Sequence, residues 1–331
     1  MTKFGRISLG LVLSSLMVWL VFRGLDWDQV GHSLRDVSPP VVMGAVILFM
    51  MAGFLRAVRW RCLFINFPIS SSRLFIIQNE GIGLNNMLPV RVASDPAQVA
   101  ILTVRDGVQP STAIATLGME RIIDTISSAM ILLAAVFFVP QMRQFSDYLW
   151  VPAAVIILAI VGVKTISWAG QNFELIRKVP FLSSLSWAVS ELEKHPDRLI
   201  ASLLLSILFW LTVGVASWFV AVGVGLPISP ITAMVTIMGT IFIATTMPSA
   251  PSALGTFEYA MLIILERFGV EREAGLGFAL ICHAVFFLPP TIIAAIFLPR
   301  EGLQIAQRLR GRLPWKRMPD SPEPMLTGDS A

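Results

Sequence analysis

Apolar runs long enough to cross a lipid bilayer recur along this chain, and they limit its fold more than any other feature. A spanning helix needs about 20 mainly apolar residues. Runs near that length cover residues 7–22, 41–55, 113–139, 149–168, 199–224 and 274–298. The chain is 55% hydrophobic and 14% charged, whereas a soluble domain carries about a quarter charged residues. The sequence therefore predicts an all-α, polytopic bundle of transmembrane helices.

These runs predict one integral membrane domain over residues 1–312, with a first half at about 1–139 and a second at about 149–299. The first run follows basic residues, lacks a small-residue cleavage pattern and is followed directly by Arg23. We therefore expect an uncleaved transmembrane helix there. Residues 313–331 are Pro-rich and polar, so a disordered cytoplasmic tail is expected.

Lys and Arg concentrate in alternate links between the runs. The basic links cover the N-terminal end and residues 56–105, 164–198 and 308–317. Because basic loops remain on the cytoplasmic side, both termini are predicted to be cytoplasmic. The formal net charge of +4 thus reflects membrane orientation, and nucleic acid is not an expected partner. An amphipathic helix is expected along the same interface at residues 180–194.

Two further apolar segments, residues 74–104 and 231–265, are interrupted and do not fit ordinary spans. Their breaks contain Asn86, Pro89, Pro248 and Pro251. Each segment suits a pair of half-helices that meet in a re-entrant hairpin, which is tolerated in a membrane only where the turn is buried in protein or lines a cavity.

The two breaks occupy similar places in the two halves of the chain. Each follows about two spans and precedes one, and the first would enter the membrane from the cytoplasm and the second from outside. This pattern is typical of an inverted-topology repeat with a binding site near the midplane. The alternative is a coincidence of proline kinks, which are common in membrane helices.

Glu120, Arg121 and Asp124 lie inside an apolar run, where charged groups are costly and often mark a functional site. Glu120 and Asp124 are four residues apart and share a helix face, whereas Arg121 is turned by about 100° and can reach a different partner. We expect Arg121 to hold a phosphate while the carboxylates orient it or meet a cationic head group. The alternative is that the three tie their helix to its neighbours through buried ion pairs.

Each break adds candidate binding residues. Asn86 can satisfy backbone groups freed at the first break, and Arg91 would contact an anionic head group or, alternatively, extend to the membrane interface. At the second break, Gly255 permits close backbone approach, and a half-helix beginning nearby presents free N–H groups to an anion. Glu258 is a candidate partner for Arg121 or Arg91, or alternatively a cap for the freed backbone.

Signatures of catalysis are missing from the sequence. It contains no ATP-binding loop, no HExxH and no nucleophile elbow. Cys62 and Cys282 are far apart in apolar surroundings and are expected to be buried thiols. His283 stands alone in the last run and is expected to be a packing residue whose hydrogen bonds are satisfied. We predict no catalytic residue, no metal site, no cofactor and no enzymatic activity.

Three blocks, NMLPVR at 86–91, MERIID at 119–124 and PSAPSALGTFE at 248–258, resemble the lysylphosphatidylglycerol synthetase transmembrane-domain family. These are flippase-like membrane proteins of bacteria and archaea. The resemblance covers nearly the whole chain and points to Arg91, Glu120, Arg121, Asp124 and Glu258. Some relatives also carry a soluble aminoacyl-transferase domain. This sequence shows no such domain, so aminoacylation of lipids is not expected.

The chain departs from the family pattern at the breaks. A Gly-Gly pair of the second block is Ser252-Ala253 here, and Ala93-Ser94 replaces a Gly-acidic pair after the first block. An expected arginine shortly afterwards is Ala97. These differences concern the substrate contacts and leave the expected architecture unchanged.

These observations favour a lipid transporter in the cytoplasmic membrane of a bacterium or archaeon. It would bind an anionic or zwitterionic head group in a cavity between inverted halves and pass it between leaflets, downhill or with ion coupling. The alternative is a non-transport scaffold or accessory subunit for a lipid- or envelope-modifying enzyme, which would bind at residues 180–194. A homo-oligomer is a further expected partnership.

Overall fold

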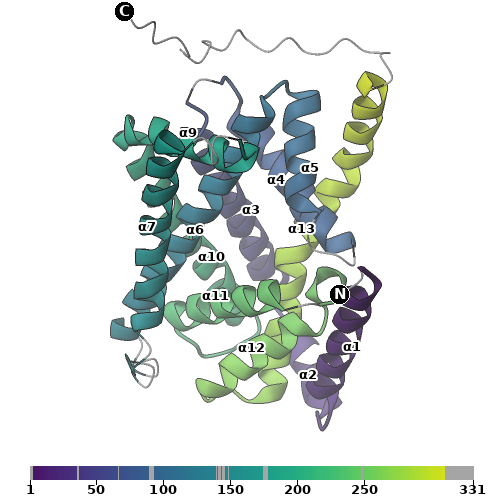
Figure 1. The fold of residues 1–331 in the computed structure, drawn as a ribbon. Coiled ribbons are helices and arrows are strands. Elements are labelled where there is room, and N and C mark those ends of the chain that lie inside the picture. Colours follow the sequence, from purple (N-terminus) through teal and green to yellow (C-terminus); the bar gives the residue numbers. More distant parts are fainter. Residues whose placement is uncertain are drawn as a thin grey trace, which may run out of the picture.

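Long apolar helices make up most of the protein (Figure 1). The computed structural model describes residues 3–35, 37–65, 67–88, 93–138, 140, 143, 146–147, 149–173, 178–247 and 249–309. Its long helices are α1 (Lys3–Phe22), α3 (Pro39–Cys62), α6 (Pro110–Phe138), α7 (Trp150–Asn172), α10 (Pro196–Gly223) and α13 (Arg272–Leu309). All regular elements in the described part of the chain are helices, so the predicted fold class is confirmed.

Five helices are long and apolar enough to cross a membrane, namely those over Pro39–Cys62, Pro110–Phe138, Trp150–Gly170, Pro196–Gly223 and Arg272–Arg308. They match five of the predicted spans. The remaining predicted span, at residues 7–22, corresponds to α1, in which Val12–Phe22 forms a shorter apolar stretch. Several helices begin with proline in the first turn, as at Pro39 and Pro196. Proline suits this position because the N–H that it lacks would have no partner within the helix.

Both interrupted segments form hairpins of shorter helices. The first consists of α4 (Ser71–Met87) and α5 (Ser94–Ala100), which continues into the π-helical turn η1 (Ile101–Arg105). The second consists of α11 (Pro230–Thr246), the single turn η3 (Pro251–Ala253) and α12 (Thr256–Arg267). The two hairpins were predicted over 74–104 and 231–265, so these breaks are confirmed with slightly wider bounds.

The order of elements is the same in both halves. A long helix, α3 or α10, leads into a hairpin and then into a second long helix, α6 or α13. The first hairpin follows the end of α3, whereas the second follows the end of α10, which lies beside the start of α3 because the Ser38 amide donates to the Gly223 carbonyl oxygen. The two hairpins therefore start from opposite ends of the bundle, and the inverted repeat stays a prediction. Packing between the halves is unequal, however: α3 and α10 make the most extensive helix contact, α13 packs broadly on α4, and α6 touches α11 only slightly.

The remaining helices lie at the two ends of the bundle. α9 (Pro180–Glu193) packs against α6 and α7, and its Leu185, Val189 and Leu192 are buried in a core cluster. The amphipathic helix predicted at 180–194 is therefore present, but its apolar face packs on protein. α2 (Trp27–Arg35) lies at the opposite end and packs on α13 (Figure 1).

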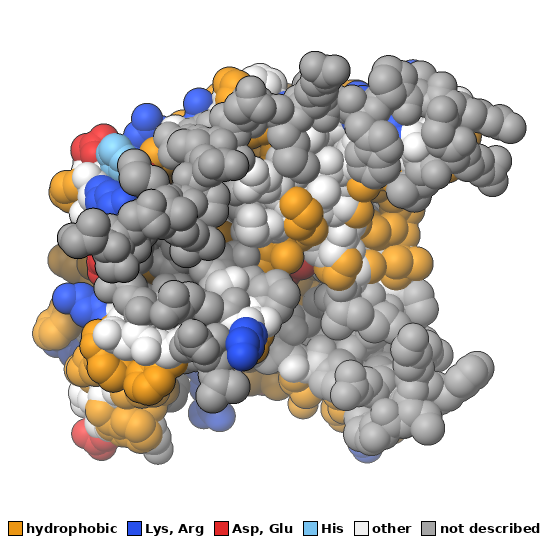
Figure 2. Space-filling view, turned by 45° about the horizontal axis from the view of Figure 1, so that its top comes forward, with side chains coloured by type: hydrophobic (Ala, Val, Ile, Leu, Met, Phe, Trp, Pro, Cys, Tyr) orange, Lys and Arg blue, Asp and Glu red, His pale blue; other side chains and the backbone are white. Residues whose placement is uncertain are grey.

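Basic residues gather at the end of the bundle where α3 ends and α4 begins. This basic end carries Arg61, Arg73, Arg105, Lys194, Arg198 and Arg308, in agreement with the uneven links of the sequence. In the space-filling view, Lys and Arg side chains are scattered over the described surface, and hydrophobic side chains form patches between them (Figure 2). Orientation relative to the cytoplasm stays a prediction, and the predicted tail at 313–331 lies outside the described residues.

Candidate functional site

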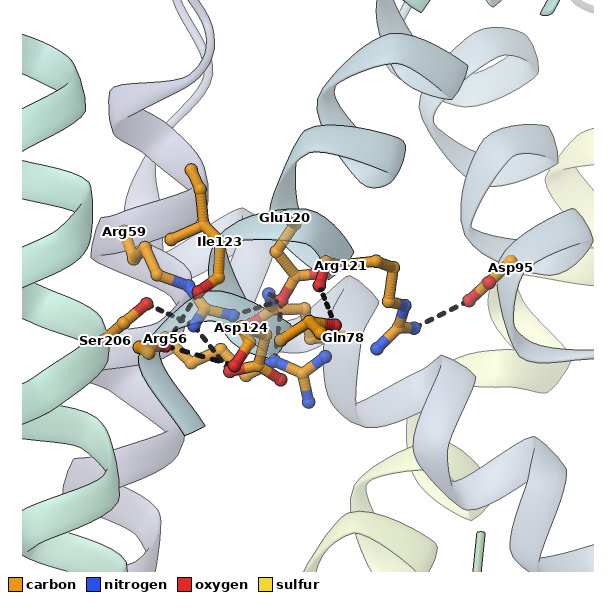
Figure 3. A network of polar contacts seen from close by, with 11 residues as sticks. Arg56, Arg59, Gln78, Asp95, Glu120, Arg121, Ile123, Asp124 and Ser206 are labelled. Atoms are coloured by element: carbon orange, nitrogen blue, oxygen red, sulfur yellow. Dashed lines mark hydrogen bonds and ion pairs between the residues drawn. The ribbon is translucent and has the colours of Figure 1, made fainter. Parts of the chain in front are cut away.

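Four charged side chains join α3 to α6 inside the bundle (Figure 3). Arg56 and Arg59 are three residues apart on α3, and Glu120 and Asp124 are four apart on α6, so each pair lies on one helix face. Glu120 Oε1 accepts hydrogen bonds from Arg56 Nε at 2.7 Å and from Arg59 Nη2 at 2.8 Å. Arg59 Nη1 donates to Asp124 Oδ1 at 2.8 Å. We call these four residues the ion-pair network.

Two neighbouring helices contribute neutral partners to this network. Gln78 of α4 donates from Nε2 to Glu120 Oε1 at 3.3 Å, and Ser206 of α10 accepts from Arg59 Nη1 at 2.6 Å. The Arg59 guanidinium carbon also lies 5.8 Å from the ring centroid of Phe209, within the range of a cation–π contact. Four helices thus meet around two cations and two anions whose charges balance, which limits the cost of keeping them in an apolar bundle.

Exposure increases steadily from the centre of this network outward. The side chains of Arg59 and Glu120 are 0% and 1% exposed. Those of Arg56 and Asp124 are 15% and 24% exposed. A buried core of the network is therefore continuous with polar groups that a ligand can reach.

Arg121 extends this series to the surface of the bundle. It points away from Glu120 and reaches across to α5, where Nη2 donates to Asp95 Oδ1 at 2.8 Å (Figure 3). The Arg121 and Asp95 side chains are 46% and 54% exposed. An ion pair that is half exposed contributes little to stability, so either charge can exchange its partner for a ligand group. The prediction that Arg121 reaches a different partner from Glu120 and Asp124 is confirmed.

Several buried polar atoms around the network have no hydrogen-bond partner among the described residues. They are Arg59 Nε, Gln78 Oε1 and Glu120 Oε2. Buried polar atoms are normally paired in folded proteins, so a group of unpaired ones calls for an explanation. Here they cluster on α3, α4 and α6, where they leave the site with unused hydrogen-bonding capacity.

The two helix breaks contact each other directly. Ser252 Oγ of η3 donates to the Asn86 carbonyl oxygen at the end of α4, at 3.0 Å. Asn86 Nδ2 donates to Thr291 Oγ1 at 3.0 Å and to the Phe287 carbonyl at 3.3 Å. Asn86 therefore fastens the first break to α13 and the second break, while Asn85 Oδ1 accepts from the Ser94 amide at 3.0 Å and closes the first hairpin.

The second break is held by a carboxylate and an imidazole. Glu258 Oε2 accepts from the Gly255 amide at 2.8 Å, and its Oε1 lies 2.5 Å from His283 Nδ1 on α13. Glu258 thus caps the start of α12, the alternative considered above, and the pair with Arg121 is not formed. His283 is buried, contacts the rings of Phe257 and Phe287 and finds its polar partner in Glu258, so the expectation of a satisfied packing residue is confirmed.

Backbone conformation at this break explains the residues that the family pattern places there. Gly255 has φ of +81°, and a Cβ there would lie 2.8 Å from the Ser14 carbonyl oxygen of α1. Ser252 and Ala253 have φ of 57° and 59°, the left-handed region that favours glycine. Pro251 begins the intervening turn. The Gly-Gly expected from the resemblance thus falls on the two residues that adopt this conformation.

The structure brings only some of the predicted site residues together. Glu120 and Asp124 form the network with Arg121 at its exposed edge, whereas Asn86 and Glu258 belong to the joint between the breaks. Arg91, Pro89 and Pro248 lie outside the described residues. Arg56 and Arg59 are the site residues that the sequence does not reveal, because basic residues at the end of an apolar run indicate membrane orientation equally well. Their spacing of three on α3 is the one signal, since it complements the spacing of four between the carboxylates on α6.

The chemistry available here is recognition of charge. Guanidinium groups bind phosphate through paired donors, and Asp95 and Asp124 can accept hydrogen bonds from an ammonium group. Among the residues that the structure describes, no three His, Cys, Asp or Glu side chains are grouped so as to hold a metal ion. The arrangement therefore suits a zwitterionic or anionic ligand.

Comparison with known proteins agrees with this architecture. No curated protein matches the chain. A family described as the lysylphosphatidylglycerol synthase TM region, flippase-like in general, matches residues 7–294. That range includes both hairpins, the ion-pair network and most of α13. The chain therefore belongs to the lysylphosphatidylglycerol synthase transmembrane-region family.

Proposed function

We propose that this protein moves a phospholipid between the leaflets of a membrane and binds its polar head group at the exposed edge of the ion-pair network. The supporting observation is the gradient of exposure from Arg59, which is buried, to Arg121, which is half exposed. Charged groups at membrane depth are expensive and usually serve a polar ligand or pathway. A network that only fastened helices would gain nothing from an exposed ion pair at its edge.

The head group would replace the contact between Arg121 and Asp95. Its phosphate takes the guanidinium group of Arg121, and an amine, where the lipid has one, takes the carboxylate of Asp95. Arg56 and Asp124 stand next along the gradient, so the head group can exchange partners without leaving a charge unpaired. The acyl chains would remain beside the apolar outer surfaces of the helices.

The proposed setting is the cytoplasmic membrane of a bacterium or archaeon, with both termini on the cytoplasmic side. The lipid is anionic or zwitterionic. A scaffold function at residues 180–194 is less well supported, because Leu185, Val189 and Leu192 of α9 are already buried within the protein. We propose no enzymatic activity for the chain.

Leaflet exchange of fluorescent phosphatidylglycerol and phosphatidylethanolamine in proteoliposomes tests the proposal. Arg121→Ala should slow the exchange of at least one lipid by tenfold or more. Arg198→Ala is the matched control, because Arg198 is an exposed arginine at the basic end that lies outside the network, and it should keep the wild-type rate. Equal rates for the wild type and Arg121→Ala would contradict the proposal.

A further inference from the structure

A cavity of about 420 Å³ opens at the end of the bundle opposite the basic end. It lies where α1 ends, beside α12 and the first turn of α13, and Figure 1 shows α1, α2 and α12 together at this end. Its polar lining comprises Arg23, Tyr259, Glu266 and Arg272, and its apolar wall includes Leu20 and Leu262. None of these residues takes part in the ion-pair network or in the joint between the breaks.

The charges around this cavity favour an anion. Two arginines face one carboxylate there. Arg272 donates from Nη2 to the Leu20 carbonyl oxygen, which fixes its guanidinium group at the cavity wall, while its buried Nε has no partner among the described residues. The Arg23 guanidinium carbon lies 4.8 Å from the Trp19 ring centroid. Both cations are therefore positioned by contacts that leave donors free.

Aromatic residues place the cavity at the level of lipid head groups. Trp19, Phe22 and Trp27 are exposed next to it, and the rings of Phe22 and Trp27 stack with centroids 5.2 Å apart. Exposed tryptophans of this kind gather at the membrane–water interface. Leu20 and Leu262 would then contact the first carbons of an acyl chain, while the arginines contact the polar group above them.

We propose that this cavity binds the phosphate-bearing head group of a phospholipid in the leaflet opposite the basic end. It would be a second head-group site, made of other residues than the one proposed at Arg121. Phosphate is the shared chemistry of a lipid head group and a soluble phosphate ester, and the interfacial position favours the lipid. This site exists whether or not the protein moves lipids.

Binding can be measured on the full chain in detergent by native mass spectrometry with added dioleoylphosphatidylglycerol. The Arg121→Gln background is used, so that the head-group site of the proposed function does not contribute. Adding Arg23→Gln to that background should remove one retained lipid or weaken its apparent affinity at least tenfold. Arg267→Gln is the matched control, because Arg267 is exposed at the same end but does not line the cavity, and it should change nothing.

Arg272→Gln should weaken binding similarly, but it also removes the bond to Leu20, so Arg23→Gln gives the decisive comparison. Glycerol 3-phosphate provides the second arm of the experiment. Failure of millimolar glycerol 3-phosphate to displace the lipid supports a lipid site. Displacement at equal concentrations, or unchanged lipid retention in Arg23→Gln, would overturn the proposal. Leaflet exchange rates do not enter this measurement, so its failure is distinguishable from failure of the proposed function.

Discussion

Arg59 of α3 and Glu120 of α6 form a 2.8 Å ion pair with side chains 0% and 1% exposed. They are fully enclosed by protein in a helical membrane bundle, and the charges of Arg56 and Asp124 complete a neutral set around them. Such a pair is strongly coupled, because removing one partner leaves the other charge buried and unpaired. The pair therefore fixes α3 against α6 next to the half-exposed ion pair of Arg121 and Asp95.

Replacing Arg59 should destabilise the bundle more than replacing Arg121. Arg59→Met keeps much of the side-chain length but removes one of the two positive charges that pair with the buried Glu120 carboxylate. We therefore expect a loss of about 3 kcal/mol in unfolding free energy. Thermal or denaturant unfolding in detergent measures this change. Arg121→Ala should stay within about 0.5 kcal/mol of the wild type, because its ion pair is half exposed.

A double-mutant cycle checks that the effect of Arg59 comes from this pairing. Arg59→Met combined with Glu120→Gln should lower the unfolding free energy by clearly less than the sum of the two single changes. In the double variant both charges are removed together, so neither is left buried without its partner. Simple additivity would show that the two side chains act independently, against the geometry of the network.

Ala253→Gly should be tolerated although Ala253 is completely buried. Its φ of 59° disfavours a side chain by about 1–2 kcal/mol, and relief of that strain should offset the lost methyl group and the greater freedom of glycine in the unfolded state. Ala260→Gly is the matched control in the regular part of α12 and should cost about 1 kcal/mol or more. Unfolding measurements on both variants that gave equal losses would contradict the assigned backbone conformation.

Glu301 should hold the end of α13 against the first hairpin. Its carboxylate is buried, accepts from Arg73 Nη1 at 2.8 Å and also contacts Arg105. Arg73 additionally donates to Asp106 at 2.9 Å. We expect Glu301→Gln to reduce stability by about 3 kcal/mol and to speed amide hydrogen exchange across residues 71–105.

Glu273→Gln is the control for that experiment, because Glu273 lies on the same helix at its opposite end. Its hydrogen-exchange profile in the first hairpin should match the wild type. If Glu301→Gln gave the same profile as Glu273→Gln, the ion pairs of Glu301 would not be what holds α13 to the hairpin.

The sequence was sufficient to predict the helices and the two hairpins, for a physical reason. Lipid requires long apolar runs, and a cluster of proline and polar residues within such a run is compatible with few structures. The hairpin predicted at 74–104 is observed at 71–105, and that at 231–265 is observed at 230–267. These features depend on local composition, which a single sequence contains.

The partners within the site could not be predicted in the same way. Arg59 and Glu120 are 61 residues apart, and the link between them includes a complete hairpin. Glu258 and His283 lie on different helices, so neither residue indicates the other by spacing. Arg56 and Arg59 also resemble the basic residues that flank any transmembrane helix, and only the tertiary structure shows that they turn inward.

Reversing the charges of the exposed ion pair tests the central claim most directly. Arg121→Glu places a carboxylate opposite Asp95, and adding Asp95→Arg again places a guanidinium group and a carboxylate opposite each other at this position. Leaflet exchange of labelled phospholipid is followed in proteoliposomes. We predict that Arg121→Glu reduces exchange at least tenfold and that adding Asp95→Arg recovers most of the lost rate. A wild-type rate in Arg121→Glu would contradict the claim that the head group passes between these two residues.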